Sequence, residues 1–416
     1  MVKEYNHYLE YRGQDLYLEG VSLKALAEEF GTPLYVYSGS YIRERIRAYR
    51  EAFPKALICY AVKANFNPHI VELAKEEGAG ADIVSGGELF VSLKAGVEPS
   101  RIVYAGVGKT IKELEYAINS DILMFNVESF MELDVLNELA GKLGKKARIA
   151  IRVNPDVDPK THPYISTGMK KSKFGVDIKT AKKEYEYARK LKNLQVVGIH
   201  CHIGSQILDV SPYIEASQKV LELYYDLVKE GFDIQYLDLG GGLGIKYKPE
   251  QSNPEPSDLA EAILQVVKDV KAKLILEPGR SVVGNAGILL TQVQFVKDKG
   301  HKHFVIVDAG MNDLVRPAMY EAYHHIVPVE RKDRPYTKTD VVGPICETGD
   351  FLALDRELQA VERGEYLAVL SAGAYGFAMS SHYNVRPRAC EVLVEKGKYR
   401  VIRRREDYEY ITYSYT

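Results

Sequence analysis

Tryptophan is absent from this 416-residue sequence, and cysteine is nearly so. The four cysteines, Cys59, Cys201, Cys346 and Cys390, lie far apart, and no two of them form a Cys-x-x-Cys pair. Such spacing argues against a disulfide framework and against a structural zinc site. It is typical of a protein of the reducing cytoplasm, where we expect this chain to reside.

Long apolar runs and an excess of one charge are also missing. No stretch approaches the ~18 consecutive apolar residues that a membrane-spanning helix needs. Residues 1–12 are polar and aromatic, without the apolar core of a signal peptide. The 55 Lys and Arg residues balance 57 Asp and Glu residues, which leaves a net charge of -2. This balance gives no field that would attract nucleic acid or anionic membranes, so we expect neither as a partner.

What the sequence does contain is a regular alternation over residues 38–280. Short runs rich in Val, Ile and Leu, as in strands buried on both faces, alternate with segments of helical periodicity. We predict eight strands, at 57–64, 81–85, 102–105, 123–127, 148–153, 196–202, 236–239 and 274–276. With a leading helix near 41–53, this pattern predicts an α/β fold with a closed (β/α)8 barrel. An open doubly wound sheet is the alternative, but no nucleotide-binding fingerprint supports it.

The pattern changes after Arg280. Strands joined by turns are predicted at 304–309, 340–342, 366–371, 390–394 and 399–403, with a hairpin tip at 396–398. Two further short strands, at 8–11 and 16–18, lie outside the count of eight. We therefore predict a second, mostly antiparallel β domain that is formed by residues 281–416 together with residues 1–37.

One connection inside the predicted barrel is too long for an ordinary loop. Residues 155–177 contain three prolines and two glycines, so they cannot form a regular helix. Long loops without secondary structure are often functional in compact domains. Because this loop follows a barrel strand, we expect it to cover an active site.

Polar or glycine-rich segments follow six of the predicted strands, and the carboxyl ends of barrel strands are where active sites lie. The segments contain Lys63 and Asn65, Asp82 and Glu88, Arg152 and Asn154, His200 to Ser205, Gly240 to Gly242, and Glu277 to Arg280. Any one of them could be an ordinary solvated strand end. Six such ends on one rim predict an active site.

Lys63 is ambiguous by itself, because a lysine after an apolar strand is usually solvated. In a barrel mouth, burial would favour a neutral, nucleophilic amine that can form an imine. Lys109 and Lys173 compete for the same role. The segment 106–110 also resembles a phosphate-binding P-loop, but Val103 stands where that motif needs its first glycine, so we reject it.

The glycine turn and the segment after the last barrel strand suggest a bound phosphate and a bound ring. Backbone N–H groups of Gly240, Gly241 and Gly242 can converge on an anion, although tight turns also need glycine. Glu277 can keep a pyridine nitrogen protonated, and Arg280 supplies a planar cation for a carboxylate or phosphate.

His200 and His202 share one face of a strand. A His-x-His pair can bind a metal ion, but no third ligand with convincing spacing is found, so we predict no metal site. A packed barrel histidine and, for His202, stacking on a cofactor are the remaining interpretations. The Ser205 hydroxyl could join a phosphate site.

Three features of the predicted β domain stand out. Cys346 lies between turn residues and acids, whereas the other three cysteines lie in apolar strands. Tyr375 is the one aromatic residue of a small-residue turn at 371–376. Arg316 and Tyr320 would share one helix face, although a surface arginine stacked on a tyrosine is an equal alternative.

Together these segments resemble a known family. Residues 60–65 (YAVKAN), 200–205 (HCHIGS), 240–242 (GGG) and 277–280 (EPGR) are similar to those of the fold-type III pyridoxal-phosphate (PLP) decarboxylases, whose barrel is of the alanine-racemase type. Within that group, residues 162–168, 346–350 and 371–388 resemble the diaminopimelate decarboxylases. The resemblance spans essentially the whole chain.

The resemblance implies a role for each matched residue. Lys63 would hold PLP through an imine, His202 would stack on its ring, and Glu277 would pair with the pyridine nitrogen. The other cofactor contacts that it implies are Asp82, Ser205, Gly241, Gly242, Gly279, Arg280 and Tyr375.

The implied reaction is decarboxylation of meso-2,6-diaminopimelate to L-lysine and CO2, the last step of lysine biosynthesis. Cys346 would return a proton to the α-carbon, and Glu347 would bind the distal ammonium group. The other implied substrate contacts are Arg280, Arg316, Tyr320 and Tyr375. In this family Cys346 and Glu347 come from the partner subunit, so a homodimer is implied.

Three alternatives remain. The substrate could be another basic amino acid (ornithine, lysine or arginine), but ornithine and lysine offer no distal carboxylate to a pair of arginines. A PLP-carrier protein would resemble a lone barrel and would not need residues 281–416. A catalytically inactive regulator is disfavoured by the joint presence of Lys63, Glu277 and Cys346.

Overall fold

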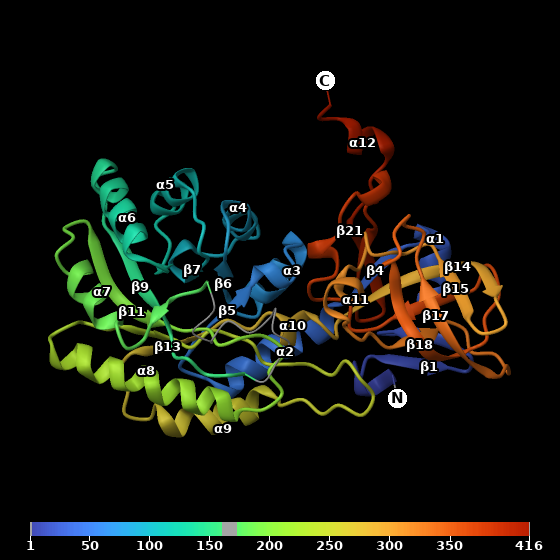
Figure 1. The fold of residues 1–416 in the computed structure, drawn as a ribbon, viewed down its shortest axis with the longest axis horizontal. Coiled ribbons are helices and arrows are strands. Elements are labelled where there is room, and N and C mark those ends of the chain that lie inside the picture. Colours follow the sequence, from blue (N-terminus) through green and yellow to red (C-terminus); the bar gives the residue numbers. More distant parts are fainter. Residues whose placement is uncertain (1, 160–172, 416) are drawn as a thin grey trace. The chain divides into compact units, whose positions relative to one another are not determined.

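The computed structural model describes residues 2–159 and 173–415. The chain divides into two compact units (Figure 1). The barrel unit comprises Glu44–Ile245 and Asn253–Ser281, and the β unit comprises Met1–Arg43, Lys246–Ser252 and Val282–Thr416. Among the described helices, none has the length and apolar character to cross a membrane.

Eight parallel strands form a closed ring in the barrel unit, which confirms the predicted (β/α)8 barrel. In ring order they are β5 (Leu57–Ala61), β6 (Gly80–Ile83), β7 (Ile102–Tyr104), β8 (Met124–Val127), β9 (Ala147–Asn154), β11 (Leu194–His200), β12 (Tyr236–Asp238) and β13 (Lys273–Leu276). Pairing of β13 with β5 closes the ring. Each of the eight predicted strands overlaps one of these strands. A short extra strand, β10 (Val176–Asp177), pairs with β9.

A leading helix precedes the first barrel strand, as predicted, and further helices follow the strands and surround the ring (Figure 1). They are α2 (Gly39–Ala52), α3 (Pro68–Glu76), α4 (Gly86–Lys94), α5 (Ile111–Asn119), α6 (Phe130–Lys142), α7 (Ala181–Ala188), α8 (Ser211–Lys229), α9 (Pro256–Val266) and the short α10 (Arg280–Val283). Ser85, Thr110 and Ser129 accept hydrogen bonds from the first turns of α4, α5 and α6. These caps start each helix just beyond a strand, which keeps the connecting loops short.

Apolar and polar residues separate along the barrel strands. The apolar cluster inside the barrel consists of Leu57, Cys59, Val103, Leu123, Met124, Ala150, Val197 and Ile275. The buried polar residues lie at or near the last residue of their strands; they are Asp82, Asn126, Arg152, His200, Asp238 and Glu277. The carboxyl rim is therefore the polar end of the barrel, as active sites of this fold require.

The β unit contains nine strands in one sheet, mostly antiparallel as predicted. They are β4 (Leu34–Ser38), β14 (Gly287–Asp298), β15 (His303–Val307), β16 (Ile326–Pro328), β17 (Tyr336–Val342), β18 (Phe351–Gln359), β19 (Tyr366–Val369), β20 (Cys390–Glu395) and β21 (Lys398–Arg403). Only β15–β17 and β4–β20 pair in parallel among them. The predicted hairpin tip joins β20 to β21.

The amino-terminal hairpin belongs to the β unit but not to its main sheet. β1 (Leu9–Arg12), β2 (Asp15–Leu18) and β3 (Val21–Ser22) form a sheet of their own, followed by α1 (Leu23–Phe30). Their leucines join one apolar cluster with residues of β4, β14, β19 and β20. The short helices α11 (Arg316–Tyr320) and α12 (Tyr408–Thr412) complete the unit.

Five strands of the β unit were missed in the sequence: β3, β4, β14, β16 and β18. The five residues of β4 are all buried, so they show no alternation, and α2 begins at the next residue, Gly39. In β14 and β18, buried and exposed positions do not alternate regularly. The expected cover at 155–177 falls largely on residues 160–172, which lie outside the described residues.

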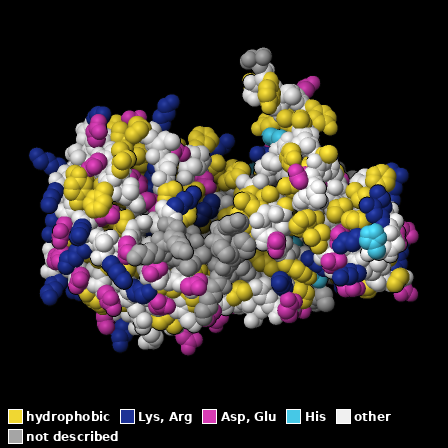
Figure 2. All heavy atoms as spheres, in the orientation of Figure 1, with side chains coloured by type: hydrophobic (Ala, Val, Ile, Leu, Met, Phe, Trp, Pro, Cys, Tyr) yellow, Lys and Arg dark blue, Asp and Glu magenta, His cyan; other side chains and the backbone are white. Residues whose placement is uncertain are grey.

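Surface charge is mixed, as the composition predicts. On the face drawn in Figure 2, basic and acidic side chains are interspersed, and neither sign gathers into one large area over the described residues.

Candidate active site

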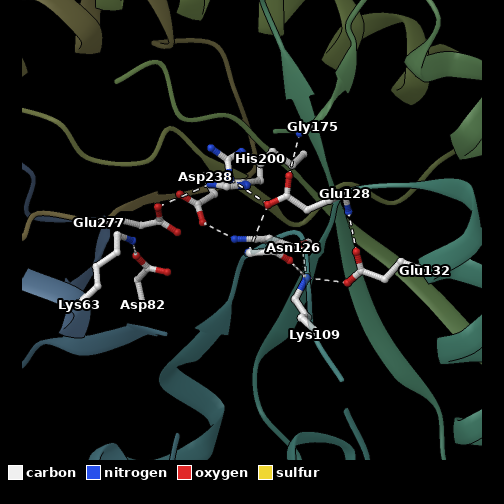
Figure 3. Close-up of polar contacts among 12 residues, drawn as sticks. Lys63, Asp82, Lys109, Asn126, Glu128, Glu132, Gly175, His200, Asp238 and Glu277 are labelled. Carbon is white, nitrogen blue, oxygen red and sulfur yellow. Dashed lines mark hydrogen bonds and ion pairs between the residues drawn. The ribbon is translucent and has the colours of Figure 1, made fainter. Parts of the chain in front are cut away.

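Lys63 lies in a 3-10 turn, η2 (Val62–Ala64), that follows β5. Its ammonium group pairs with the carboxylate of Asp82 on β6 (Figure 3). Asp82 is fully buried, whereas 32% of the Lys63 side chain is exposed. Burial and the nearby charge of Glu277 raise the pKa of Asp82 to about 7, although Lys63 acts against this rise. The amine is therefore held by an acid and still open to a ligand.

Glu277 follows β13 and is buried among polar groups. Its Oε2 atom lies 3.5 Å from Nε2 of His200, the last residue of β11. Its Oε1 atom has no hydrogen-bond partner among the described residues. Burial disfavours the Glu277 charge, but His200 and Lys63 hold the pKa of this carboxyl well below its usual range. Burial also lowers the pKa of His200, so we assign His200 as a neutral ring and Lys63 as the compensating charge.

His202 lies just beyond β11 with a defined tautomer. The backbone N–H of Gly241 donates to its Nδ1 atom over 3.2 Å, so the ring proton lies on Nε2. Burial lowers the pKa of His202 well below its usual value, and the charges of Arg152 and Lys63 add to this effect. The ring is therefore neutral.

The turn after β12 needs glycine, because neighbouring backbone atoms leave no space for a side chain. A Cβ atom on Gly241 would lie 2.0 Å from the carbonyl oxygen of Glu277, and one on Gly242 would lie 2.2 Å from that of Gly204. On Gly279, a Cβ atom would lie 2.9 Å from the Cβ atom of Ala61, in the strand that leads to Lys63. These glycines bring the loops after β11, β12 and β13 together beside the lysine turn.

Arg280 and Ser205 are brought together, although 75 residues separate them in the sequence. The buried Arg280 donates from Nη2 to the Ser205 hydroxyl over 2.9 Å and from Nε over 3.3 Å. This pair offers a cation and a hydroxyl group at the end of β13, where an anionic group of a ligand could bind.

Arg316 and Tyr320 lie in the β unit, on α11. The Arg316 guanidinium is 5.9 Å from the Tyr320 ring centroid and 5.1 Å from that of Tyr247. Its Nε atom also contacts Nε2 of His324 at 3.4 Å. Arg316 is buried, so the alternative of an arginine on the surface stacked on a tyrosine is wrong.

Cys346 and Glu347 are exposed on a tightly held turn of the β unit. The backbone N–H of Cys346 donates to Asn384 Oδ1 over 2.8 Å. The buried carboxylate of Asp350 accepts from the N–H groups of Ile345 and Met311, each over 2.6 Å. The sequence did not single out Asp350 and Asn384 for this role. They fix the backbone on both sides of the thiol.

The remaining cysteines differ from Cys346 as predicted. Cys59, Cys201 and Cys390 are free and buried, whereas Cys346 is free and exposed. Burial raises the pKa of Cys201 to about 12 and that of Cys59 well above its usual value. These thiols are consequently inert at neutral pH.

Tyr375 is half-buried in the β unit, with a backbone φ of +55°. A residue with a side chain rarely adopts this conformation, which is more frequent at functional sites than elsewhere. Together with the turn of small buried residues before it, this conformation sets the direction of the phenol.

A polar network at the carboxyl ends of β7, β8 and β9 was missed in the sequence (Figure 3). Lys109 donates to the carbonyl groups of Gly106 and Asn126 and to the carboxylate of Glu132, and its side chain is only 1% exposed. It is therefore a structural lysine and does not compete with Lys63. Glu128 accepts from Arg152 over 2.8 Å and from the N–H of Gly175 over 2.7 Å.

Asp238, at the end of β12, was also missed. It accepts from the N–H of Gly240 over 3.0 Å and contacts the Asn126 amide at 3.4 Å. The sequence does contain a signal for Asp238, since an acid inside the apolar run before the glycine turn is unusual for a buried strand.

Known proteins share this arrangement of sequence and fold. The family described as "Pyridoxal-dependent decarboxylase, pyridoxal binding domain" matches residues 40–284. A diaminopimelate decarboxylase of Aquifex aeolicus is 73% identical over 411 residues, covering 99% of this chain and 98% of the relative. One of Neisseria meningitidis serogroup B is 52% identical, with 95% of each chain covered.

Solved structures agree with the sequence matches. The crystal structure of diaminopimelate decarboxylase from Helicobacter pylori complexed with L-lysine superposes with a TM-score of 0.91 at 45% identity, covering 94% of this chain and 98% of that one. Matches of this extent exceed what a shared fold alone requires. The chain belongs to the pyridoxal-dependent decarboxylases and, within them, to the diaminopimelate decarboxylase family.

Proposed function

We propose that this chain decarboxylates meso-2,6-diaminopimelate to L-lysine and CO2, the last step of lysine biosynthesis, with PLP as its cofactor. The observation that carries the proposal is the buried Glu277, ionised and with Oε1 unpartnered among the described residues, on the same rim as Lys63. The relatives' names and the L-lysine bound to the Helicobacter pylori protein support the substrate.

The rim residues fit PLP in three respects. The Oε1 atom of Glu277 can accept a hydrogen bond from a protonated ring nitrogen, and Lys63 has a reachable amine. The neutral ring of His202 offers a face for stacking. When bound, PLP accepts the electron pair that is left when CO2 departs. The other residues that would hold it are Asp82, Ser205, Gly241, Gly242, Gly279, Arg280 and Tyr375.

The β unit supplies the groups that a substrate with two carboxylates and two ammonium groups needs. Arg316 and Tyr320, with Arg280 of the barrel unit, would bind the distal carboxylate, and Glu347 would bind the distal ammonium group. Tyr375 would contact both substrate and cofactor. The thiol of Cys346 would donate the proton that replaces CO2 on the α-carbon.

The proposal includes the assembly and the division of labour along the chain. Residues 38–280 would hold the cofactor, and residues 1–37 and 281–416 would contribute substrate and dimer contacts. Cys346 and Glu347 would act in the partner subunit's site, which makes a homodimer the smallest active form. A cytoplasmic location is part of the proposal, because the four free thiols suit a reducing compartment.

A substrate panel tests this function. The protein, loaded with PLP, is given meso-diaminopimelate, ornithine, lysine or arginine, and CO2 and the amine product are measured. We expect L-lysine from meso-diaminopimelate, with kcat/KM at least about 100-fold lower for the other three, which leave the distal arginines unpaired. Release of CO2 from ornithine but not from meso-diaminopimelate would overturn the assignment.

A further inference from the structure

Two buried carboxyl groups are in contact behind the candidate cofactor site. Asp238 ends β12 and Glu277 follows the neighbouring strand β13, and their side chains share a hydrogen bond. Figure 3 shows the two carboxyl groups directed toward each other. Single polar atoms of Asp238, Glu277 and His200 all lie within 4.8 Å of one another, and all three residues are buried.

Such a pair cannot carry two negative charges. Two buried carboxylates in hydrogen-bond contact repel each other strongly, so at neutral pH one of them keeps a proton and donates it to the other. The groups around each carboxyl determine which of the two residues holds the proton.

The surroundings differ in charge. Asp238 is contacted by two neutral donors, the N–H of Gly240 at 3.0 Å and the amide of Asn126 at 3.4 Å. Its titratable neighbours are two acids, Glu277 and Asp82, and the His200 ring, which burial keeps neutral. Glu277 instead faces the His200 and His202 rings and the positive charge of Lys63. The negative charge therefore belongs on Glu277.

We infer that Asp238 is a positioning residue that stays protonated and donates a hydrogen bond to the Glu277 carboxylate. The pKa of Asp238 agrees with this assignment, because burial and the neighbouring Glu277 raise it well above its usual value. The protonation of Asp238 is independent of the proposed function, and only its consequence for cofactor binding rests on that function. A proton on Asp238 leaves Glu277 ionised and fixed, with Oε1 available to the ring nitrogen of PLP.

Asn126 completes the arrangement. Its Nδ2 atom faces Oδ2 of Asp238, while its own Oδ1 atom has no hydrogen-bond partner among the described residues. An Asp238→Asn variant would present an N–H in place of the O–H to Glu277. The Asn126 amide can turn over to accept from it, so an asparagine should imitate the protonated acid.

The infrared spectrum of the apoenzyme tests the proton directly. The carboxyls with a pKa of about 7 (Asp82, Glu184 and Asp313) are ionised at a pH of about 9. We expect a C=O band of a buried carboxylic acid that persists at this pH, disappears in Asp238→Asn and remains in Asp82→Asn. A band that is missing from the parent protein, or unchanged in Asp238→Asn, would overturn the inference.

Cofactor affinity gives a second, independent test. Equilibrium dialysis of PLP with the apoenzyme should give a Kd for Asp238→Asn within about threefold of the parent, and a Kd at least about tenfold weaker for Asp238→Ala. An Asp238→Asn variant as weak as Glu277→Gln would contradict a protonated Asp238. If the parent itself binds no PLP, the proposed function fails while the infrared result still decides the proton.

Discussion

At the scale of single residues, two lysines on the barrel rim have different surroundings. Lys63 pairs with one acid and remains partly exposed, whereas the Lys109 amine is enclosed by two carbonyl groups and a carboxylate. Position after a strand does not distinguish them in the sequence. The difference arises from the loop after β7, which turns Lys109 inward.

Replacing Lys63 by alanine should abolish cofactor retention. We expect Lys63→Ala, after gel filtration, to lose the visible absorbance band of bound PLP and at least about 10³-fold of kcat, because the covalent attachment is removed. Absorbance and CO2 release measure the two effects. Lys173→Ala is the matched control, since Lys173 is exposed and should change neither. A retained band in Lys63→Ala would assign the cofactor to another amine.

Thiol exposure gives a prediction for Cys346. The native protein should react with one equivalent of iodoacetamide per chain, and the unfolded protein with four, because three of the four thiols are buried. Peptide mapping should locate the native label on Cys346, and activity should fall in proportion to labelling, by about 10²-fold or more when complete. Full labelling without loss of activity would remove Cys346 from the reaction.

Which site residues could be predicted depends on how local their environment is. Lys63, Glu277, Arg280 and the glycine turn are visible because each follows an apolar strand directly. Asp238 and the Glu128–Arg152 pair were not predicted, since their partners come from other strands of the closed ring. Only closure of the barrel shows that an acid inside a strand meets a second acid.

At the scale of elements, α7 contains a buried acid whose Oε2 atom has no hydrogen-bond partner among the described residues. This acid is Glu184, and burial raises its pKa to about 7. The folded state therefore binds a proton that the unfolded state releases at lower pH. The contribution of Glu184 to stability is complete below its unfolded pKa of about 4.5 and is lost as the pH rises through about 7.

Glu184→Gln should remove this pH dependence. Above pH ~8 we expect the variant to have a free energy of unfolding about 1–3 kcal/mol higher than the parent, and below pH ~4.5 the difference should vanish. Urea unfolding at several pH values measures it. Glu186→Gln, on the exposed side of the same helix, should change stability by less than about 0.5 kcal/mol at every pH. An equal effect of both variants would contradict the assignment.

Element prediction succeeded where one rule applied to every repeat. Each barrel strand is a short apolar run, and the first four are followed by side-chain helix caps at Asn67, Ser85, Thr110 and Ser129, so each unit could be predicted independently of the others. In the β unit, β4 leaves the amino-terminal segment to pair with β14 and β20, which follow more than 240 residues later. Such pairings have no local signal, because they depend on strands that are distant in the sequence.

At the scale of the whole molecule, the candidate residues divide between the two units. The barrel unit holds Lys63, Asp82, His202, Ser205, Glu277 and Arg280, and the β unit holds Arg316, Tyr320, Cys346, Glu347 and Tyr375. Neither unit alone contains both a lysine for the cofactor and an exposed thiol. An active site that uses both must therefore combine the units, within one chain or across a dimer.

Mixing two inactive variants distinguishes these possibilities. In a heterodimer of Lys63→Ala and Cys346→Ala, sites shared between subunits leave one site with both mutations and one site intact. Random mixing of equal amounts makes half of the dimers mixed, so about a quarter of the parent activity should return. Sites within one chain would give no recovery, because each site keeps one mutation. CO2 release from the mixture measures this activity. Differently tagged variants, mixed after mild dissociation, confirm exchange when dimers that carry both tags are recovered, and these purified heterodimers should have about half of the parent activity. Exchange without recovery would reject the shared site and leave the residue assignments intact.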